Sequence, residues 1–80
     1  MNIYKLSHAA HCPNDGIADV YEITIESNNA IQVELILSTL EGSPKVIFQE
    51  DLTDYLRRDI PAKITTVGTH HGVQITCVRV

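Results

Sequence analysis

The segment from Val20 to Glu26 constrains the fold most, because apolar and polar side chains alternate along it without interruption. Its members divide into Tyr21, Ile23 and Ile25 on one side and Glu22, Thr24 and Glu26 on the other. Successive side chains of a β-strand point to opposite faces of a sheet. The pattern therefore predicts a half-buried strand, with one face against a core and the other facing water.

Three more strands are expected at the two ends of the chain. Residues 1–8 fit a short first strand, and residues 62–67 and 73–80 fit a hairpin around the turn-like residues 68–72. Cys77 shares a face of the last strand with Val73 and Ile75, so we interpret it as a small buried hydrophobic residue.

Residues 30–40 are ambiguous between strand and helix. Two apolar sets overlap there: Ile31, Val33, Leu35 and Leu37 at strand spacing, and Val33, Ile36, Leu37 and Leu40 at helix spacing. We favour a helix, with Asn29 and Gln32 as an N-cap pair and residues 41–44 as its stop.

A second helix is predicted between Pro44 and Pro61. Its apolar face consists of Phe48, Leu52, Tyr55 and Leu56. Acidic residues occupy its early turns and two arginines its end, which is the charge order that the helix macrodipole favours.

These elements predict an α+β fold in the order ββααββ, with one antiparallel four-stranded sheet and two helices on one face. The 80 residues make a single domain, residues 1–80, whose core is small for its surface. Two sheet edges stay open and invite pairing with further copies. We therefore expect a homo-oligomer.

Charge and hydropathy narrow the choice of partners. The formal net charge of -4 argues against tight unaided binding to nucleic acid or to an anionic membrane. We find no signal-peptide pattern and no apolar run near the length of a membrane span. The expectation is a cytoplasmic protein without a membrane partner.

The stretch from His8 to Asp19, HAAHCPNDGIAD, is the strongest candidate for chemistry. Cys12 lies between two histidines and a proline, and Asp19 follows it seven residues later. A protonated His8 or His11 close to the thiol would lower its pKa. Taken alone, Cys12 fits an inconsequential surface loop as well as it fits a nucleophile.

Four motifs in order resemble the nitrile reductases of queuosine biosynthesis, a family with the tunnelling fold (T-fold). CPNDGIAD is similar to the family's active-site stretch, Val33-Glu34 to the start of its Val-Glu-Ser-Lys-Ser helix, and FQED at residues 48–51 to its Phe-His-Glu-Asp. The hairpin ITTVGTHHGVQI is similar to its last two strands. The resemblance covers residues 8 to 78.

The resemblance implies 7-cyano-7-deazaguanine as the substrate, as free base or within nucleic acid. It implies Cys12 as the nucleophile that forms a thioimide, and Asp19 as the acid that protonates the nitrile nitrogen. It further implies substrate-binding roles for Glu34, Glu50, Gln49 and Phe48, the carboxylates accepting from the guanine-like N–H edge. Subunits of this family form rings with active sites at their junctions.

Departures from the family's pattern indicate a different reaction of the thioimide after it has formed. The places that help to hold the phosphates of NADPH read LILST and THHG here, without lysine or arginine, and Gln49 replaces the family's histidine. The amidine-forming enzymes of archaeosine biosynthesis are a related branch without the nicotinamide site, in which ammonia opens the thioimide. We expect this branch, with no cofactor, and keep NADPH-dependent reduction as the alternative.

Two further alternatives stay open. His8, His11 and Cys12, with His70 or His71, offer zinc-compatible ligands, although their spacing fits no common zinc pattern and we assign no metal site. A binding protein that kept the fold and lost the catalytic chemistry is equally consistent with the missing NADPH residues.

Overall fold

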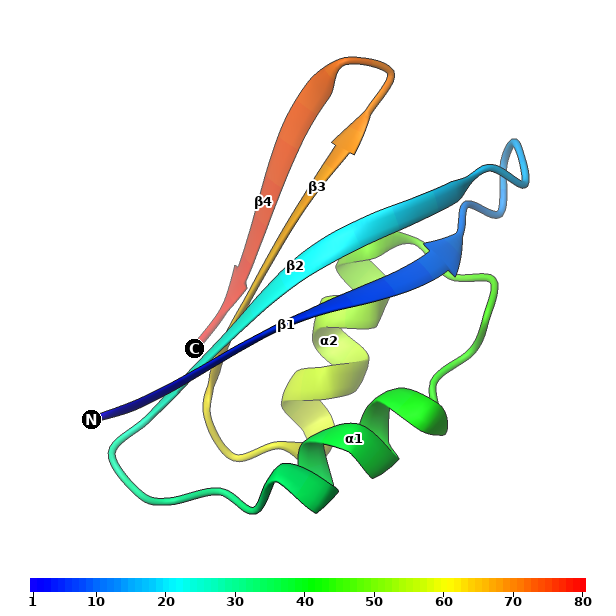
Figure 1. Ribbon diagram of the computed structural model, residues 1–80. Coiled ribbons are helices and arrows are strands. Elements are labelled where there is room, and N and C mark those ends of the chain that lie inside the picture. Colours follow the sequence, from blue (N-terminus) through cyan, green and yellow to red (C-terminus); the bar gives the residue numbers. More distant parts are fainter.

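The computed structural model describes all residues, 1–80, as four strands and two helices in the order ββααββ (Figure 1). The elements are β1 (Asn2–His11), β2 (Ala18–Ser27), α1 (Val33–Glu41), α2 (Gln49–Asp59), β3 (Lys63–His70) and β4 (Val73–Arg79). The strands form one antiparallel sheet in the order β1-β2-β3-β4. The predicted α+β fold class is confirmed.

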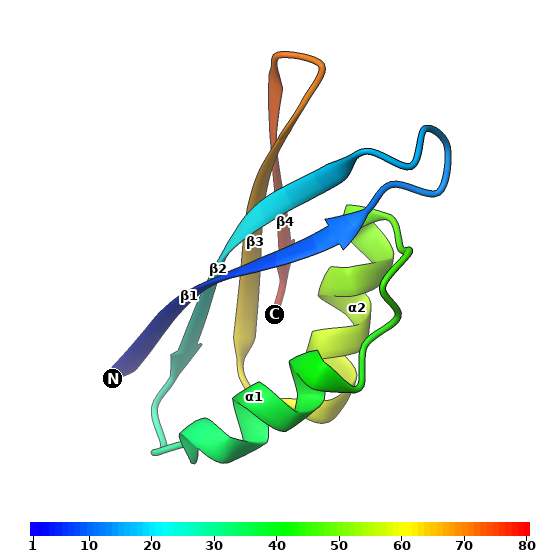
Figure 2. The ribbon, with the colours of Figure 1, turned by 45° about the vertical axis from the view of Figure 1, so that its right-hand side comes forward.

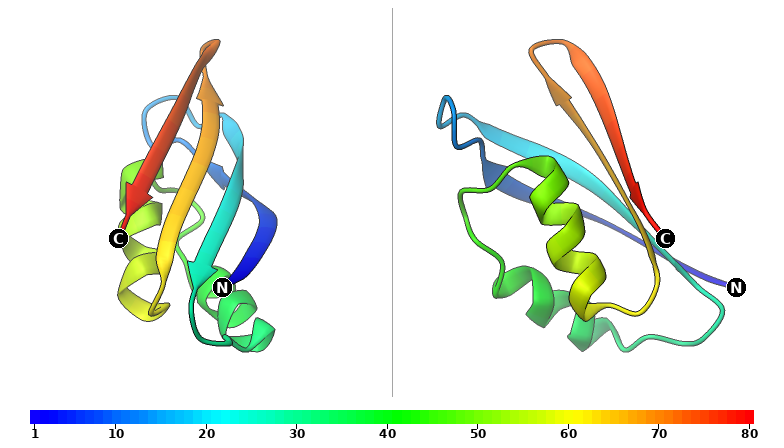
Figure 3. Two further views of the ribbon diagram at one scale, coloured as in Figure 1. Left: turned by 90° about the vertical axis from the view of Figure 1, so that its left-hand side faces the viewer. Right: turned by 180° about the vertical axis from the view of Figure 1, so that it is seen from behind.

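Both helices lie on the same face of a twisted sheet, and the core fills the space between these two layers (Figures 2 and 3). The fully buried side chains come from both layers: Ile23, Ile25, Thr66 and Ile64 from the sheet, and Leu52, Thr53, Leu56 and Ile60 from α2 and the residue after it. The apolar side of the predicted strand at 20–26 is therefore the side that the helices cover.

β1 and β2 are longer than predicted, and they shorten the loop that carries Cys12. The two strands pair from Asn2 with Ser27 to His11 with Ala18. The connection between them is residues 12–17, so His8 and His11 lie in a strand. Asp19 also lies within a strand, one residue from its start.

α1 confirms the helical interpretation of residues 30–40, but two details of that prediction are wrong. The N-cap is Gln32, without a side-chain cap, because Asn29 belongs to a turn in which its N–H donates to Ser27 Oγ at 3.1 Å. Of the predicted apolar face only Ile36 and Leu40 are buried, whereas Val33 and Leu37 are more than half exposed. The two exposed side chains therefore do not contribute to the core.

α2 begins at Gln49, five residues after Pro44, because residues 45–47 run in extended form beside the end of β1. The His11 N–H donates to Lys45 O at 2.8 Å, and the Ile47 N–H donates to His11 O at 3.0 Å. Phe48 is the N-cap and is 43% exposed, so its predicted place on the buried helix face is wrong. Leu52 and Leu56 are buried as expected.

The hairpin of β3 and β4 is confirmed, with a tighter turn than predicted. His70 pairs with Val73, which leaves His71 and Gly72 as a two-residue turn. Both have positive φ, 49° and 81°, as a type I′ turn requires. Cys77 is buried as predicted, although Val73 and Ile75 on the same face are exposed.

The edges of the sheet are β1 and β4. Neither helix is long and apolar enough to cross a membrane.

Candidate active site

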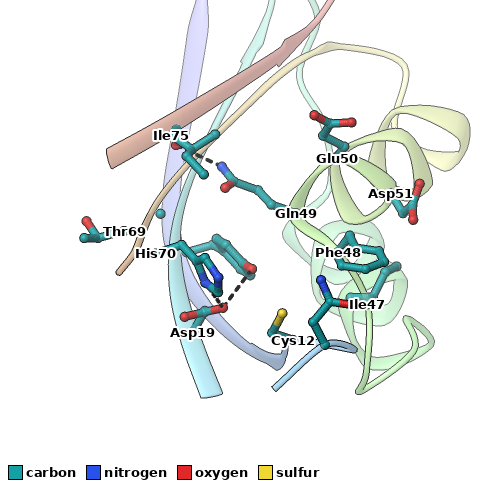
Figure 4. A pocket seen from close by; sticks show the side chains of 13 residues that line it. Cys12, Asp19, Ile47, Phe48, Gln49, Glu50, Asp51, Thr69, His70 and Ile75 are labelled. Atoms are coloured by element: carbon teal, nitrogen blue, oxygen red, sulfur yellow. Dashed lines mark hydrogen bonds and ion pairs between the residues drawn. The ribbon is translucent and has the colours of Figure 1, made fainter. Parts of the chain in front are cut away.

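A pocket of about 380 Å³ opens between the loop after β1, the start of α2 and the upper part of the β3–β4 hairpin (Figure 4). Its lining comes from these places and from β2: Cys12 and Asn14 of the loop; Asp19 and Tyr21 of β2; Ile47, Phe48, Gln49, Glu50 and Asp51 around the start of α2; and Gly68, Thr69, His70 and Ile75 of the hairpin. The volume falls within the range of small-molecule sites, roughly 300–1,000 Å³.

The loop that carries Cys12 is a closed turn that fixes the thiol toward the pocket. The Cys12 N–H donates to Ile17 O at 2.9 Å, and the Gly16 N–H donates to Cys12 O at 2.8 Å. Gly16 has a φ of 72°, which glycine adopts without strain. Asp15 Oδ1 accepts from the Ile17 N–H at 2.9 Å and completes the turn.

The backbone pairing of His11 with residues 45–47, which precede α2, also brings the first residues of α2 close to Cys12. His11 bridges to Val46 in parallel fashion, and Cys12 is the next residue along the chain. Figure 4 shows the Cys12 sulfur between the Asp19 carboxylate on one side and Ile47 and Phe48 on the other. Cys12 is 7% exposed, so small reactants reach it only through the pocket.

The Asp19 carboxylate lies close to the thiol, because ligand atoms of Cys12, Asp19 and His70 are all within 4.8 Å of one another, and two side chains orient it. Tyr21 Oη donates to Asp19 Oδ2 at 3.5 Å, and His70 Nδ1 lies 3.7 Å from the same oxygen. Burial, followed by the charge of Asp19, raises the pKa of Tyr21 to about 12. Tyr21 therefore stays protonated at neutral pH and acts as a donor to Asp19.

His70 lies between two carboxylates. Its Nδ1 faces Asp19, and its Nε2 lies 3.9 Å from Asp15 Oδ2. His71 Nε2 is 3.4 Å from the same Asp15 oxygen. The hydrogen bond from the Ile17 N–H, with smaller contributions from the two histidines and the Cys12 thiol, lowers the pKa of Asp15. A chain of polar groups thus runs from the partly buried Asp19 to the exposed His71.

Gln49 ties α2 to the hairpin. Its Nε2 donates to Thr66 O at 3.1 Å and to Ile75 O at 3.0 Å. Below it, Thr53 Oγ1 and Thr66 Oγ1 share a hydrogen bond of 2.7 Å, and both residues are fully buried. The amide nitrogen of Gln49 thus holds the pocket wall, while its side-chain oxygen, Oε1, is available to accept a hydrogen bond.

Gly68 provides the space for the Tyr21 ring. A β-carbon at this position would lie 2.5 Å from Tyr21 Cδ1 and 2.6 Å from Cε1. The ring therefore packs on the bare backbone of β3, and this contact fixes the hydroxyl that reaches Asp19.

Five of the six residues expected in the site line this one pocket: Cys12, Asp19, Phe48, Gln49 and Glu50. Glu34 does not. It is exposed in the first turn of α1, which Figure 1 places at the opposite end of the molecule from the start of α2. Within one chain Glu34 and Glu50 do not meet.

His8 and His11 both lie outside the pocket. His8 is half-buried in β1, and its pKa is lowered by burial and, less, by Lys45, so it is neutral near pH 7. His11 is exposed, with Nδ1 3.1 Å from Gly16 O. Of the zinc-compatible residues in the sequence, Cys12 and His70 come together with Asp19, and His70 and His71 come together with Asp15.

Tyr21 and His70 belong to the site although sequence reasoning gave neither a role in the expected chemistry. The sequence does contain a signal for Tyr21, because it follows Asp19 by two residues in a strand and therefore lies on the same face of the sheet. His70 had none, since its contact with Asp19 depends on how the hairpin sits over β2.

No protein-family model matches the chain, and no curated protein sequence does so either. Among solved structures, the chain is similar to an archaeosine synthase QueF-Like crystallised in the apo form. The TM-score is 0.78 and the sequence identity 18%, over 98% of this chain and 89% of the other. An identity this low shows the fold alone. The chain therefore has the tunnelling fold that its four motifs predict, shared with the archaeosine synthase QueF-Like.

Proposed function

We propose that the chain is an enzyme of 7-deazaguanine modification. In this proposal Cys12 adds to the nitrile of 7-cyano-7-deazaguanine, and ammonia then converts the resulting thioimide to an amidine. The observation that carries the proposal is the convergence of Cys12, Asp19 and Glu50 on one pocket, from three separate parts of the chain.

In the first step the Cys12 sulfur forms a bond to the nitrile carbon. In this step the Asp19 carboxylate, which accepts a hydrogen bond from Tyr21, takes the thiol proton. Asp19 then passes this proton to the nitrile nitrogen as the C≡N bond becomes C=NH. The net reaction moves one proton from sulfur to nitrogen and needs no other reactant.

In the second step ammonia attacks the thioimide carbon. The C–S bond breaks, the amidine leaves, and the Cys12 thiolate regains a proton that ammonia releases. In this proposal Asp19 again accepts and returns this proton, and His70 and Asp15 connect Asp19 to the surface.

The opposite side of the pocket suits a planar, guanine-like ring. Phe48 presents an exposed ring for stacking. Glu50 offers a carboxylate for two adjacent N–H donors, and the free carbonyl oxygen of Gln49 offers a further acceptor. The apolar Ile47 and Ile75 close the sides.

Two observations favour amidine formation over reduction. The hairpin tip that borders the pocket is Thr69-His70-His71-Gly72, which gives no lysine or arginine for the phosphates of a nicotinamide nucleotide. The structural neighbour is named as an archaeosine synthase.

The experiment supplies the nitrile base with either ammonium or NADPH and identifies products by mass spectrometry. We expect an amidine, with the mass of the nitrile plus ammonia, only with ammonium and only when Cys12 is intact. An aminomethyl product formed with NADPH contradicts the amidine route. The same pair of reactions run on an oligonucleotide carrying the modified base identifies the form of the substrate.

We further propose that the site is shared between copies of the chain in a ring. The support is the open edges β1 and β4 and the position of Glu34, which reaches no pocket within its own chain. An assembly that places Glu34 of one copy at the pocket of the next gives it the role that the sequence motif implies.

Mixing two inactive variants tests the shared site. A Cys12→Ala chain combined with a Glu34→Ala chain should regain activity, because some junctions then join an intact Cys12 to an intact Glu34. A ring without such recovery confines the site to one chain, and a monomer by light scattering at micromolar concentration contradicts the assembly.

A further inference from the structure

Cys12, Asp19 and His70 place three different metal-ligating atoms within 4.8 Å of one another. They come from the loop after β1, from β2 and from the tip of β3. His70 Nδ1 and Asp19 Oδ2 are already 3.7 Å apart. Bond lengths of about 2.0–2.3 Å in tetrahedral geometry put ligand atoms roughly 3.3–3.6 Å apart, so small side-chain movements suffice.

The donor set is the one that zinc selects. A thiolate, an imidazole and a carboxylate are its common protein ligands, and sites with three protein ligands leave a fourth position open. Here the fourth position faces the pocket, since all three residues line it. Cys12 is buried and Asp19 nearly so, which excludes bulk water from two of the three ligands.

The surrounding residues match the partners that metal ligands require. A metal-bound histidine usually gives its second ring N–H to a carboxylate. With Nδ1 directed at Asp19, the Nε2 of His70 faces Asp15 Oδ2 at 3.9 Å, and Asp15 is held in turn by the Ile17 N–H. The Asp19 carboxylate has its own donor in Tyr21.

We infer that Cys12, Asp19 and His70 form a binding site for a thiophilic divalent cation, Zn²⁺ being the best match. The site stands independently of the proposed reaction. If that reaction is correct, the consequence is inhibition, because a thiolate bound to metal is not available to the nitrile. Metal and thioimide then exclude each other.

Cobalt(II) and zinc titrations of the intact protein test the site without any substrate. We expect about one metal ion per chain and a thiolate-to-cobalt charge-transfer absorption that zinc displaces. Cys12→Ser should abolish this absorption. His70→Gln should weaken zinc by more than the 10- to 100-fold that loss of an outer partner causes, and Asp15→Asn should fall within that range.

Matched controls are His11→Gln and Cys77→Ser, which change the same residue types outside the cluster and should leave zinc affinity unchanged. Unchanged affinity in His70→Gln, or cobalt binding without a thiolate absorption, overturns the assignment. Zinc should also slow alkylation of Cys12 by iodoacetamide. Such protection in a protein that forms no nitrile adduct would uphold the metal site while refuting the proposed reaction.

Discussion

Replacing Gly68 with alanine tests whether the Tyr21 ring is fixed against β3. The backbone of Gly68 is not in the left-handed region, so alanine fits the main chain. Its β-carbon, however, would lie 2.5 Å from Tyr21 Cδ1. Carbon atoms in contact lie about 3.5–4.0 Å apart, so the ring has to move by roughly 1 Å or more.

Tyr21 has little room for this movement. It is 5% exposed and belongs to the core cluster. Overpacking of a well-packed site costs about 1–3 kcal/mol. Alanine also restricts the unfolded chain, which offsets about 0.4–1 kcal/mol. Taking the middle of each range, we expect a net loss of about 1.3 kcal/mol in the free energy of unfolding.

Thermal unfolding followed by circular dichroism measures this loss, since each kcal/mol lowers the Tm of a domain of this size by roughly 4–8 °C. The control is Gly42→Ala, because Gly42 has a φ of -78° and its nearest neighbour, Tyr55 Oη, lies at 3.4 Å. Gly42→Ala should change the Tm little. A Gly68→Ala protein as stable as wild type would show that the Tyr21 ring is not held where the structure places it.

Two further variants address proton transfer and pH. Asp19→Asn should slow attack of Cys12 on the nitrile by ~10²- to 10⁴-fold while the Tm stays near wild type, and a wild-type rate in a rapid-mixing assay would limit Asp19 to a structural role. Burial lowers the pKa of His8 below its usual value of about 6.5, so the unfolded chain binds a proton more readily than the folded one. This contribution to stability is present above pH 6.5 and is lost as the pH falls through the pKa of the folded protein. The Tm of the His8→Gln variant should therefore fall less than that of wild type when the pH is lowered from 7.5 to 5.5. An equal fall in both proteins would contradict the lowered pKa of His8.

The sequence predicts the sheet well where one face is buried and the other exposed. Alternation from Val20 to Glu26 locates β2, because every second side chain meets the helices. It does not reveal that Ala18 and Asp19 extend the strand, since their pairing with His11 and Ala10 is a contact between segments. The ambiguity at residues 30–40 has a similar cause, because Val33 and Leu37 are apolar yet exposed.

The candidate site was predictable in part. Cys12 and Asp19 were found because their spacing matches a known motif, and the structure brings them to one pocket with Glu50. His70 was not predicted in its present role, since only the twist of the hairpin over β2 sets it beside Asp19. Glu34 illustrates the reverse case. Its motif implies a substrate-binding role, but within a single chain Glu34 lies outside the pocket.

The intact mass of the protein after incubation with 7-cyano-7-deazaguanine tests whether Cys12 adds to the nitrile. Thioimide formation needs no cofactor, so we expect one added mass of the nitrile base per active chain. Cys12→Ala should abolish the adduct and Cys77→Ala should retain it, because Cys77 is buried in β4 and does not line the pocket. No adduct with either the free base or an oligonucleotide that carries it would contradict the account.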